Sequence, residues 1–188
     1  MRRSPEPRPY EEARRRLQEK FGDDVTDANT TLEILQITLD KWLGKKAPWF
    51  QLKGKNVLDL ASGTASGDGF PPWFSRLCAV FEANVTAVDI RPQGNTDKRA
   101  FTCVQADLIE SVLGSGLGSI PALAGERFDL IHSPRFVGFN PDGGAAREII
   151  HRGISLSTFE DMLKDQASEL LAPGGYIDIS AVYPVSFP

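Results

Sequence analysis

Three aspartates stand at the ends of short apolar segments, where they could hold a nucleotide-like ligand. Asp59 lies within VLDLASGTASG, Asp89 is near the end of VTAVDI, and Asp107 follows FTCVQA. An acidic side chain about 20 residues beyond a glycine-rich turn, as Asp89 is, can accept hydrogen bonds from both hydroxyls of a ribose. Asp107 is placed where a carboxylate can accept from the exocyclic amine of a base. The three aspartates therefore predict that three strand ends converge on one ligand.

The turn after Asp59 consists of small residues, which favours close approach of the backbone to a ligand. Larger side chains would clash there, and amides at the start of the following helix could donate hydrogen bonds. The small residues of this turn are Ala61, Ser62, Gly63, Ala65 and Gly67.

The segments that must position these residues alternate in type. From residue 56 onward the apolar runs NVLDL, VTAVDI, FTCVQ, FDLIHS and GYIDISAV alternate with helical patterns, of which the clearest are at 71–83 and 157–171. Continuous apolar strands are typical of a sheet covered by helices on both faces. We therefore expect an α/β fold, a doubly wound and mainly parallel sheet of about five strands.

Two helices are predicted before the first strand. Residues 10–21 read as a short charged helix, and a second helix presents apolar residues at helical spacing. This stripe consists of Leu32, Leu35, Leu39 and Trp42. We divide the chain into an N-terminal helical extension (1–53) and a Rossmann-like domain (54–188), which together make one compact domain.

The helix at 157–171 carries the clearest end signals. Ser157 and Glu160 have the spacing of a capping box, and Pro173-Gly174-Gly175 marks the end of the helix. The sequence therefore predicts that the last strand begins at this Pro-Gly-Gly run.

In order along the chain, VLDLASGTASG, VTAVDI, FTCVQADL, FDLIHS and LLAPGGYIDIS resemble the successive motifs of class I S-adenosylmethionine-dependent methyltransferases. The resemblance covers roughly residues 54–181 and implies a Rossmann-like methyltransferase fold with S-adenosylmethionine as cofactor. It implies that Asp59 and the turn Ala61, Ser62, Gly63 and Ala65 contact the methionine part, Asp89 with Ile90 the ribose, Asp107 with Leu108 the adenine, and that His132 with Ser133 border the methyl group.

The chain departs from the family pattern at two points. The usual Asp-x-Gly-x-Gly-x-Gly turn is here Asp59-x-Ala61-x-Gly63-x-Ala65, which keeps only the central glycine. The family also continues after the strand GYIDISAV with another helix and an antiparallel pair of strands. We therefore expect a five-stranded sheet with an exposed edge, in a truncated chain, a natural short form or half of an assembly in which a partner or second copy covers that edge.

Each of these residues also has a purely structural interpretation. Asp59 could cap neighbouring backbone amides, Asp107 could be the N-cap of the helix LIESVL, and His132 could be a satisfied structural residue. His151 is predicted to lie on a helix surface and receives no role. Cys78 lies in LCAVF, Cys103 in FTCVQ, and both are predicted to be buried free thiols.

Two segments bear on the acceptor of the methyl group. HSPRF (132–136) faintly resembles the signature of amino-group methyltransferases, with Arg135 in place of the second proline, or it is an ordinary exit from a strand into a loop. Phe70, Trp73 and Phe74 are either a stacking platform or, as we favour, the packed first turn of a helix. Neither segment assigns a catalytic residue.

Charge and composition add little about partners. The first 20 residues carry seven basic side chains against four glutamates, so this arm either binds nucleic acid or forms a solvated face. These basic residues are Arg2, Arg3, Arg8, Arg14, Arg15, Arg16 and Lys20. The sequence predicts no metal site, no membrane span and a cytoplasmic location.

Three hypotheses about function remain open. The first is an S-adenosylmethionine-dependent methyltransferase whose acceptor, a small molecule or nucleic acid, is unknown. The second is a non-catalytic methyltransferase-like binding module or partner subunit. A nicotinamide-dependent oxidoreductase is less favoured because the sequence has no Tyr-x-x-x-Lys pair.

Overall fold

The fold is an α/β sandwich around one parallel five-stranded sheet. The structure is a computed structural model that describes residues 9–22, 28–44, 49–65, 70–133 and 144–179. The strand order is β3-β2-β1-β4-β5, and every pairing is parallel. The strands are β1 (Asn56–Leu60), β2 (Asn84–Asp89), β3 (Thr102–Gln105), β4 (Phe128–His132) and β5 (Leu171–Asp178). The predicted fold class is therefore confirmed.

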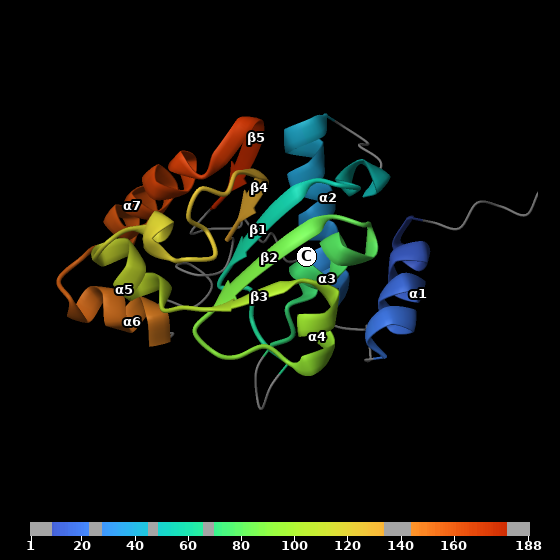
Figure 1. Cartoon of the computed structure of the whole chain (residues 1–188), viewed down its shortest axis with the longest axis horizontal. Coiled ribbons are helices and arrows are strands. Elements are labelled where there is room, and N and C mark those ends of the chain that lie inside the picture. The colour runs from blue at the N-terminus through green and yellow to red at the C-terminus, as the bar shows by residue number, and fades with distance from the viewer. Residues whose placement is uncertain (1–8, 23–27, 45–48, 66–69, 134–143, 180–188) are drawn as a thin grey trace, which may run out of the picture.

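Helices cover both faces of this sheet (Figure 1). One face packs against α1 (Pro9–Phe21), α2 (Asn29–Leu43) and α3 (Trp73–Val80), and the other against α5 (Leu108–Leu113), α6 (Gly144–His151) and α7 (Leu156–Glu169). The short helix α4 (Asn95–Ala100) leads into β3, and two 3-10 turns lie at Trp49–Leu52 and Leu117–Ser119.

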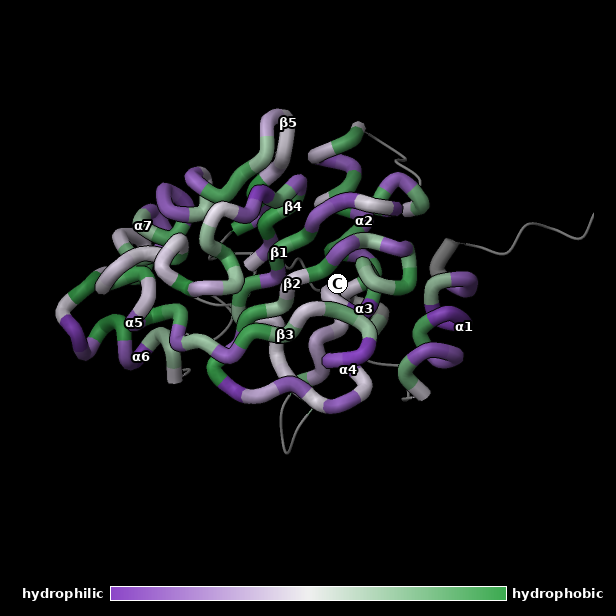
Figure 2. The backbone as a smooth tube through the Cα atoms, in the orientation of Figure 1, coloured by the Kyte–Doolittle hydropathy of each residue, from purple (hydrophilic) through white to green (hydrophobic). Residues whose placement is uncertain are grey.

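Alternation along the strands divides the apolar core between the two faces. On β1, Val57 faces the core shared with α1, α2 and α3, whereas Leu58 and Leu60 face the core shared with α5, α6 and α7. In Figure 2 the central strands carry hydrophobic residues, while α1 carries both hydrophilic and hydrophobic ones. Asp59 points to the same face as Val57 because side chains alternate along a strand. A carboxylate is therefore placed under α3, at the carboxyl end of the sheet.

The N-terminal helices belong to the same core as the sheet. Leu32, Leu35 and Leu39 of α2 are buried together with Val57 and Leu130, which confirms the predicted core-facing stripe. The two N-terminal helices therefore help to build the face on which Asp59 lies.

The predicted capping box at the start of α7 is wrong in detail. The N-cap of α7 is Ser155, whose hydroxyl accepts from the Thr158 amide, so there is no capping box between Ser157 and Glu160. Glu160 instead forms an ion pair with Lys164 one turn later.

The last strand begins earlier than the sequence predicted. Pro173-Gly174-Gly175 lies inside β5, where the pairing with β4 shifts register between Phe128 and Leu130. Gly174 has a φ of +77°, a conformation that glycine adopts readily. A proline and a left-handed glycine are tolerated in a strand at such an irregularity, so here the run marks an irregularity within β5 and not a helix end.

Candidate functional site

The turn after β1 brings backbone to the carboxyl end of the sheet. Ala61 and Gly63 both have positive φ, 56° and 85°. A Cβ on Gly63 would lie 2.4 Å from the carbonyl oxygen of Phe70, so only glycine fits there. The alanines that replace the other two family glycines are accommodated, although the left-handed Ala61 is strained. In this turn the strict requirement for a small residue falls on the central glycine, and the approach of a ligand to the turn stays a prediction.

Asp89 holds this turn in place. Its Oδ2 accepts from the Gly63 amide at 2.9 Å, and its Oδ1 accepts from the Arg91 amide at 3.0 Å. Gln93 adds a hydrogen bond from its amide nitrogen to the Ser62 hydroxyl at 3.1 Å. Each carboxylate oxygen can accept more than one hydrogen bond, so Asp89 keeps acceptor capacity for a ligand.

Asp59 is engaged by side chains on both oxygens. Ser75 of α3 donates to Oδ2 at 2.6 Å, and Nδ1 of His132 lies 3.2 Å from Oδ1. The carboxylate is only 3% exposed. The expectation that Asp59 caps backbone amides finds no support among its described partners, which are a serine and a histidine.

His132 is a buried histidine with one unused nitrogen. His132 is 4% exposed, and its ring is stacked in parallel on the ring of Phe74, with centroids 3.3 Å apart. A carboxylate only accepts hydrogen bonds, so Nδ1 carries the proton that faces Asp59, and in the neutral imidazole Nε2 then presents a lone pair. Within the described part of the chain Nε2 has no hydrogen-bond partner. A buried polar atom without a partner costs free energy and calls for an explanation.

Sequence reasoning placed Asp59 and His132 separately and missed that they pair. The available signal was the sheet order, because β1 and β4 are neighbours and Asp59 is in register with His132. Residues in register on adjacent parallel strands present side chains on the same face.

Ser133 is used internally. Its hydroxyl donates to the Leu60 carbonyl at 3.0 Å, and its amide donates to the Asp178 carbonyl at 2.9 Å. These bonds fix the exit of β4. Arg135 and Phe136 of the HSPRF segment lie outside the described residues.

Asp107 is the N-cap of α5, as its structural interpretation predicted. Both of its hydrogen bonds, from the Ile109 amide at 2.9 Å and the Glu110 amide at 3.1 Å, go to Oδ1. The adjacent Leu108 is buried. Capping therefore leaves Oδ2 of Asp107 available to a ligand.

Two cavities meet at Ala61 and contain most of the predicted site residues. The first, of about 350 Å³, is bordered by Asp59, Ala61, Ser62, Gly63 and His132, together with apolar residues and Thr31 of the helical layer. The second, of about 260 Å³, is bordered by Ala61, Asp89, Ile90, Asp107 and Leu108, together with residues of α6. Ala65 is exposed, and Ala65 and Ser133 border neither of these two cavities.

A larger hollow of about 620 Å³ lies at the other end of the strands. It is bordered by residues at the amino ends of the strands, such as Asn84 and Thr102, and by Lys98 and Arg99 of α4. Ligands of open α/β sheets bind at the carboxyl ends of the strands, which favours the pair of smaller cavities.

The three aromatic residues near the start of α3 have different environments. Trp73 and Phe74 are buried, which confirms the packed interpretation for them. Phe70 is 46% exposed and borders the first cavity, so for this residue the packed interpretation is wrong.

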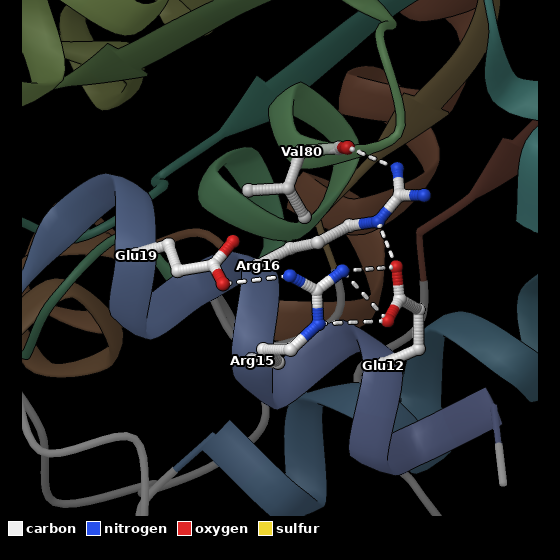
Figure 3. A network of polar contacts seen from close by, with 5 residues as sticks. All are labelled: Glu12, Arg15, Arg16, Glu19 and Val80. Carbon is white, nitrogen blue, oxygen red and sulfur yellow. Dashed lines mark hydrogen bonds and ion pairs between the residues drawn. The ribbon is translucent and has the colours of Figure 1, made fainter. Parts of the chain in front are cut away.

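The basic residues of α1 have partners within the fold (Figure 3). Arg15 pairs with Glu12 and Glu19, and Arg16 pairs with Glu12 and donates to the Val80 carbonyl at 3.2 Å. The two guanidinium groups lower the pKa of Glu12 to about 2. Cations near the last carbonyls of α3 also complement its dipole, so part of the basic arm anchors α1. Arg2, Arg3 and Arg8 lie outside the described residues.

The two cysteines differ in burial. Cys78 is buried, as predicted, and burial raises the pKa of its thiol well above the usual range. Cys103 is only half-buried, which corrects the prediction, and burial raises its pKa to about 11.

The described ranges contain neither a candidate membrane span nor a candidate metal site. None of their helices has the length and apolarity needed to cross a membrane. Nor do three or more His, Cys, Asp or Glu side chains gather there in a metal-binding arrangement.

No protein-family model and no curated protein matches the sequence, but solved structures share the fold. The chain is similar to the MycE methyltransferase of the mycinamycin biosynthetic pathway, in complex with Mg, SAH and mycinamycin VI, with a TM-score of 0.52 and 15% identity. That match covers 94% of this chain and 39% of the other. A second crystal form of MycE matches at a TM-score of 0.47 and 15% identity, over 78% of this chain and 30% of that one.

A third match is the epimerase Mth375 of Methanothermobacter thermautotrophicus, with a TM-score of 0.40 and 17% identity, over 65% of this chain and 34% of the other. The first match establishes the fold: the chain shares the Rossmann-like α/β fold of MycE and spans 39% of the length of that protein.

Proposed function

We propose that this chain binds S-adenosylmethionine and acts in S-adenosylmethionine-dependent methyl transfer. The observation that carries the proposal is the pair of cavities that meet at Ala61, at the carboxyl ends of the strands. The motif resemblance and the fold shared with a methyltransferase solved with SAH support it.

The residues at these cavities fit the parts of such a cofactor. Asp89 and Ile90 would hold the ribose, and Asp107 with Leu108 would hold the adenine, since Asp107 keeps Oδ2 for an exocyclic amine. The turn that ends at Gly63 would hold the methionine part, where a Cβ on Gly63 would collide with backbone. Acceptors on the ribose side and an unpartnered nitrogen on the methionine side are the groups that a polar ligand needs.

When bound, S-adenosylmethionine supplies an activated methyl group. The task of the chain is then to bind and orient the reactants, and orientation alone can be worth roughly 7 to 11 kcal/mol. No residue needs to be assigned acid or base chemistry for this proposal. The acceptor, a small molecule or a nucleic acid, stays open.

A partner that covers the free edge of β5 also stays a proposal. Among the described strands β5 pairs only with β4. Light scattering on the purified chain tests the version in which a second copy covers the edge, because that version requires a mass above that of one chain.

Calorimetric titration of S-adenosylmethionine into the wild type and two isosteric variants tests the cofactor site. Asp89→Asn replaces one carboxylate oxygen, which accepts from a backbone amide, by an NH₂ group that can only donate. We therefore expect the affinity for S-adenosylmethionine to fall tenfold or more. Asp129→Asn is the control, because Asp129 lies near the amino end of β4, where it binds Lys55 and the Asn56 amide.

Circular dichroism verifies that both variants fold. Equal affinity in Asp89→Asn and the wild type, or no binding to the wild type, would contradict the proposal.

A further inference from the structure

Among the polar side chains that border the first cavity, His132 has a ring nitrogen without a described partner, whereas the carboxylate of Asp59 is already engaged. Asp59 has Ser75 on Oδ2 and His132 on Oδ1, and it is buried. His132 borders the same cavity and keeps Nε2 without a described partner. His132, on the neighbouring strand β4, therefore offers this cavity an acceptor of its own.

We propose that Nε2 of His132 accepts a hydrogen bond from an N–H or O–H donor of the ligand in this cavity, with Asp59 holding the histidine in the required tautomer. The inference rests on the proposed function and deepens it. The donor is either the ammonium of the methionine part of S-adenosylmethionine or a hydroxyl of the methyl acceptor.

The ring of His132 is fixed before any ligand arrives. Phe74 stacks on it with planes 3° apart, and Asp59 binds Nδ1. The lone pair of Nε2 therefore has one direction. A fixed acceptor loses little conformational freedom on binding, which is how preorganised sites gain affinity.

The chemistry of the cavity selects a donor that is neutral or cationic. Its walls include Ile34, Pro71 and Phe74, and neither Lys nor Arg is among the described residues that border it. The buried carboxylate of Asp59 behind the imidazole favours a positively charged ligand group and disfavours a ligand that carries only negative charge.

A second unpartnered atom supports a ligand at this place. Nε1 of Trp73 is buried and has no hydrogen-bond partner among the described groups, and Trp73 borders the same cavity. An indole N–H is a donor only. An acceptor and a donor together suit a ligand that offers both kinds of group, as an amino-acid end or a hydroxyl does.

Nitrogen NMR of isotope-labelled histidine tests the proposal directly. The chain has two histidines, and His151→Gln, at an exposed position on α6, leaves His132 as the only signal. We expect the free protein to show Nδ1 protonated and Nε2 unprotonated. A protonated Nε2 in the folded His151→Gln protein would overturn the proposal.

Two pairs of probes separate the two sources of the donor. S-adenosylhomocysteine carries the amino-acid end, methylthioadenosine lacks it, and phenol supplies a hydroxyl on a small apolar ring. A shift of the Nε2 signal with S-adenosylhomocysteine but not with methylthioadenosine identifies the ammonium. A shift with phenol but not with toluene identifies a hydroxyl. An unchanged Nε2 signal with all the donors, while calorimetry shows S-adenosylhomocysteine bound, would overturn this inference and leave the proposed function standing.

Failure of the proposed function has a different signature. If S-adenosylmethionine and S-adenosylhomocysteine do not bind by calorimetry but phenol still shifts Nε2, the donor site is supported and the methyl-transfer assignment falls. If phenol also leaves Nε2 unchanged, both fall.

Asp59→Asn tests the part that Asp59 plays. Ser75 donates toward one oxygen, so the amide oxygen of the variant should face Ser75 and its NH₂ should face Nδ1. The proton then moves to Nε2, and the response to the donor probe should be lost. Asp129→Asn should retain the wild-type tautomer and response. A wild-type tautomer in folded Asp59→Asn would contradict the positioning role of Asp59.

Discussion

Ser75 and Arg76 are consecutive residues of α3, and each holds a buried carboxylate. Ser75 binds Asp59, which also binds His132. Arg76 binds Asp97 through Nε at 2.8 Å and Nη2 at 3.2 Å, and these two side chains are 2% and 1% exposed.

The two clusters differ in what encloses them. The guanidinium of Arg76 packs over the rings of Phe21 and Trp73, with its central carbon 4.8 and 5.2 Å from the centroids. The Arg76 cluster therefore joins α3, α4 and α1 within the apolar core. The Asp59 cluster opens onto a cavity, and there His132 leaves a nitrogen unpartnered among the described residues. A closed buried pair serves the fold, whereas an incomplete one beside a cavity indicates a ligand.

The largest expected loss of stability comes from breaking the ion pair between Arg76 and Asp97. Asp97→Ala removes the carboxylate that faces the buried Arg76 charge, which should cost about 3–5 kcal/mol of unfolding free energy. Urea denaturation measures this loss. Replacing both members, as Arg76→Met with Asp97→Leu, should recover most of it, because apolar side chains need no partner. A double variant as unstable as Asp97→Ala would contradict a purely structural pair.

A smaller loss is expected at the open cluster. Ser75→Ala removes a buried hydrogen bond to a carboxylate and should cost about 1.5–3 kcal/mol. The same denaturation experiment measures it. A loss equal to that of Asp97→Ala would show that the Asp59 cluster is as structural as the other and would erase the comparison.

Two helix caps provide a matched test of the second cavity. Asp107→Ala and Ser155→Ala each remove an N-cap, of α5 and α7, and each should cost about 1 kcal/mol of stability. Only Asp107→Ala should also weaken binding of S-adenosylmethionine, because only Asp107 borders the cavity. Equal affinities in the two variants would reduce Asp107 to a cap.

The smallest effect is expected at the exposed cluster of α1. Arg15 and Arg16 lower the pKa of Glu12 from 4.5 to about 2. A lowered carboxyl pKa stabilises the fold above the unfolded value, and this contribution is lost as the pH falls from about 4.5 toward 2. The slope should be shallow, since exposed ion pairs contribute little. Unfolding titrations in this pH range should show a shallower slope in Glu12→Gln than in the wild type, and identical slopes would contradict the assignment.

The sequence predicted the strands well because buried parallel strands are continuous apolar runs. It also predicted that Asp59, Asp89 and Asp107 stand at or near strand ends. It did not predict the Asp59–His132 pair, which depends on β1 and β4 being neighbours across 73 residues of chain. Arg76 and Asp97 were missed for a similar reason, since charged residues in short helices are usually solvated and only the tertiary structure encloses them.

Errors at element ends came from signals that suit more than one structure. Ser155 and Ser157 are both capping residues, and the structure uses the first. Pro173-Gly174-Gly175 suits a helix end as well as an irregularity within a strand, and in the structure it lies where the pairing with β4 shifts register. Pairing between strands is not encoded in a local pattern.

Hydrogen exchange with and without S-adenosylmethionine tests the central claim that the two cavities meeting at Ala61 form one ligand site. The account predicts added protection in three separate segments together: the turn 61–65, residues 89–91 and the start of α5. Protection confined to residues 98–103, beside the hollow at the amino ends of the strands, would contradict it. Unchanged exchange throughout the chain at saturating ligand would contradict it as well.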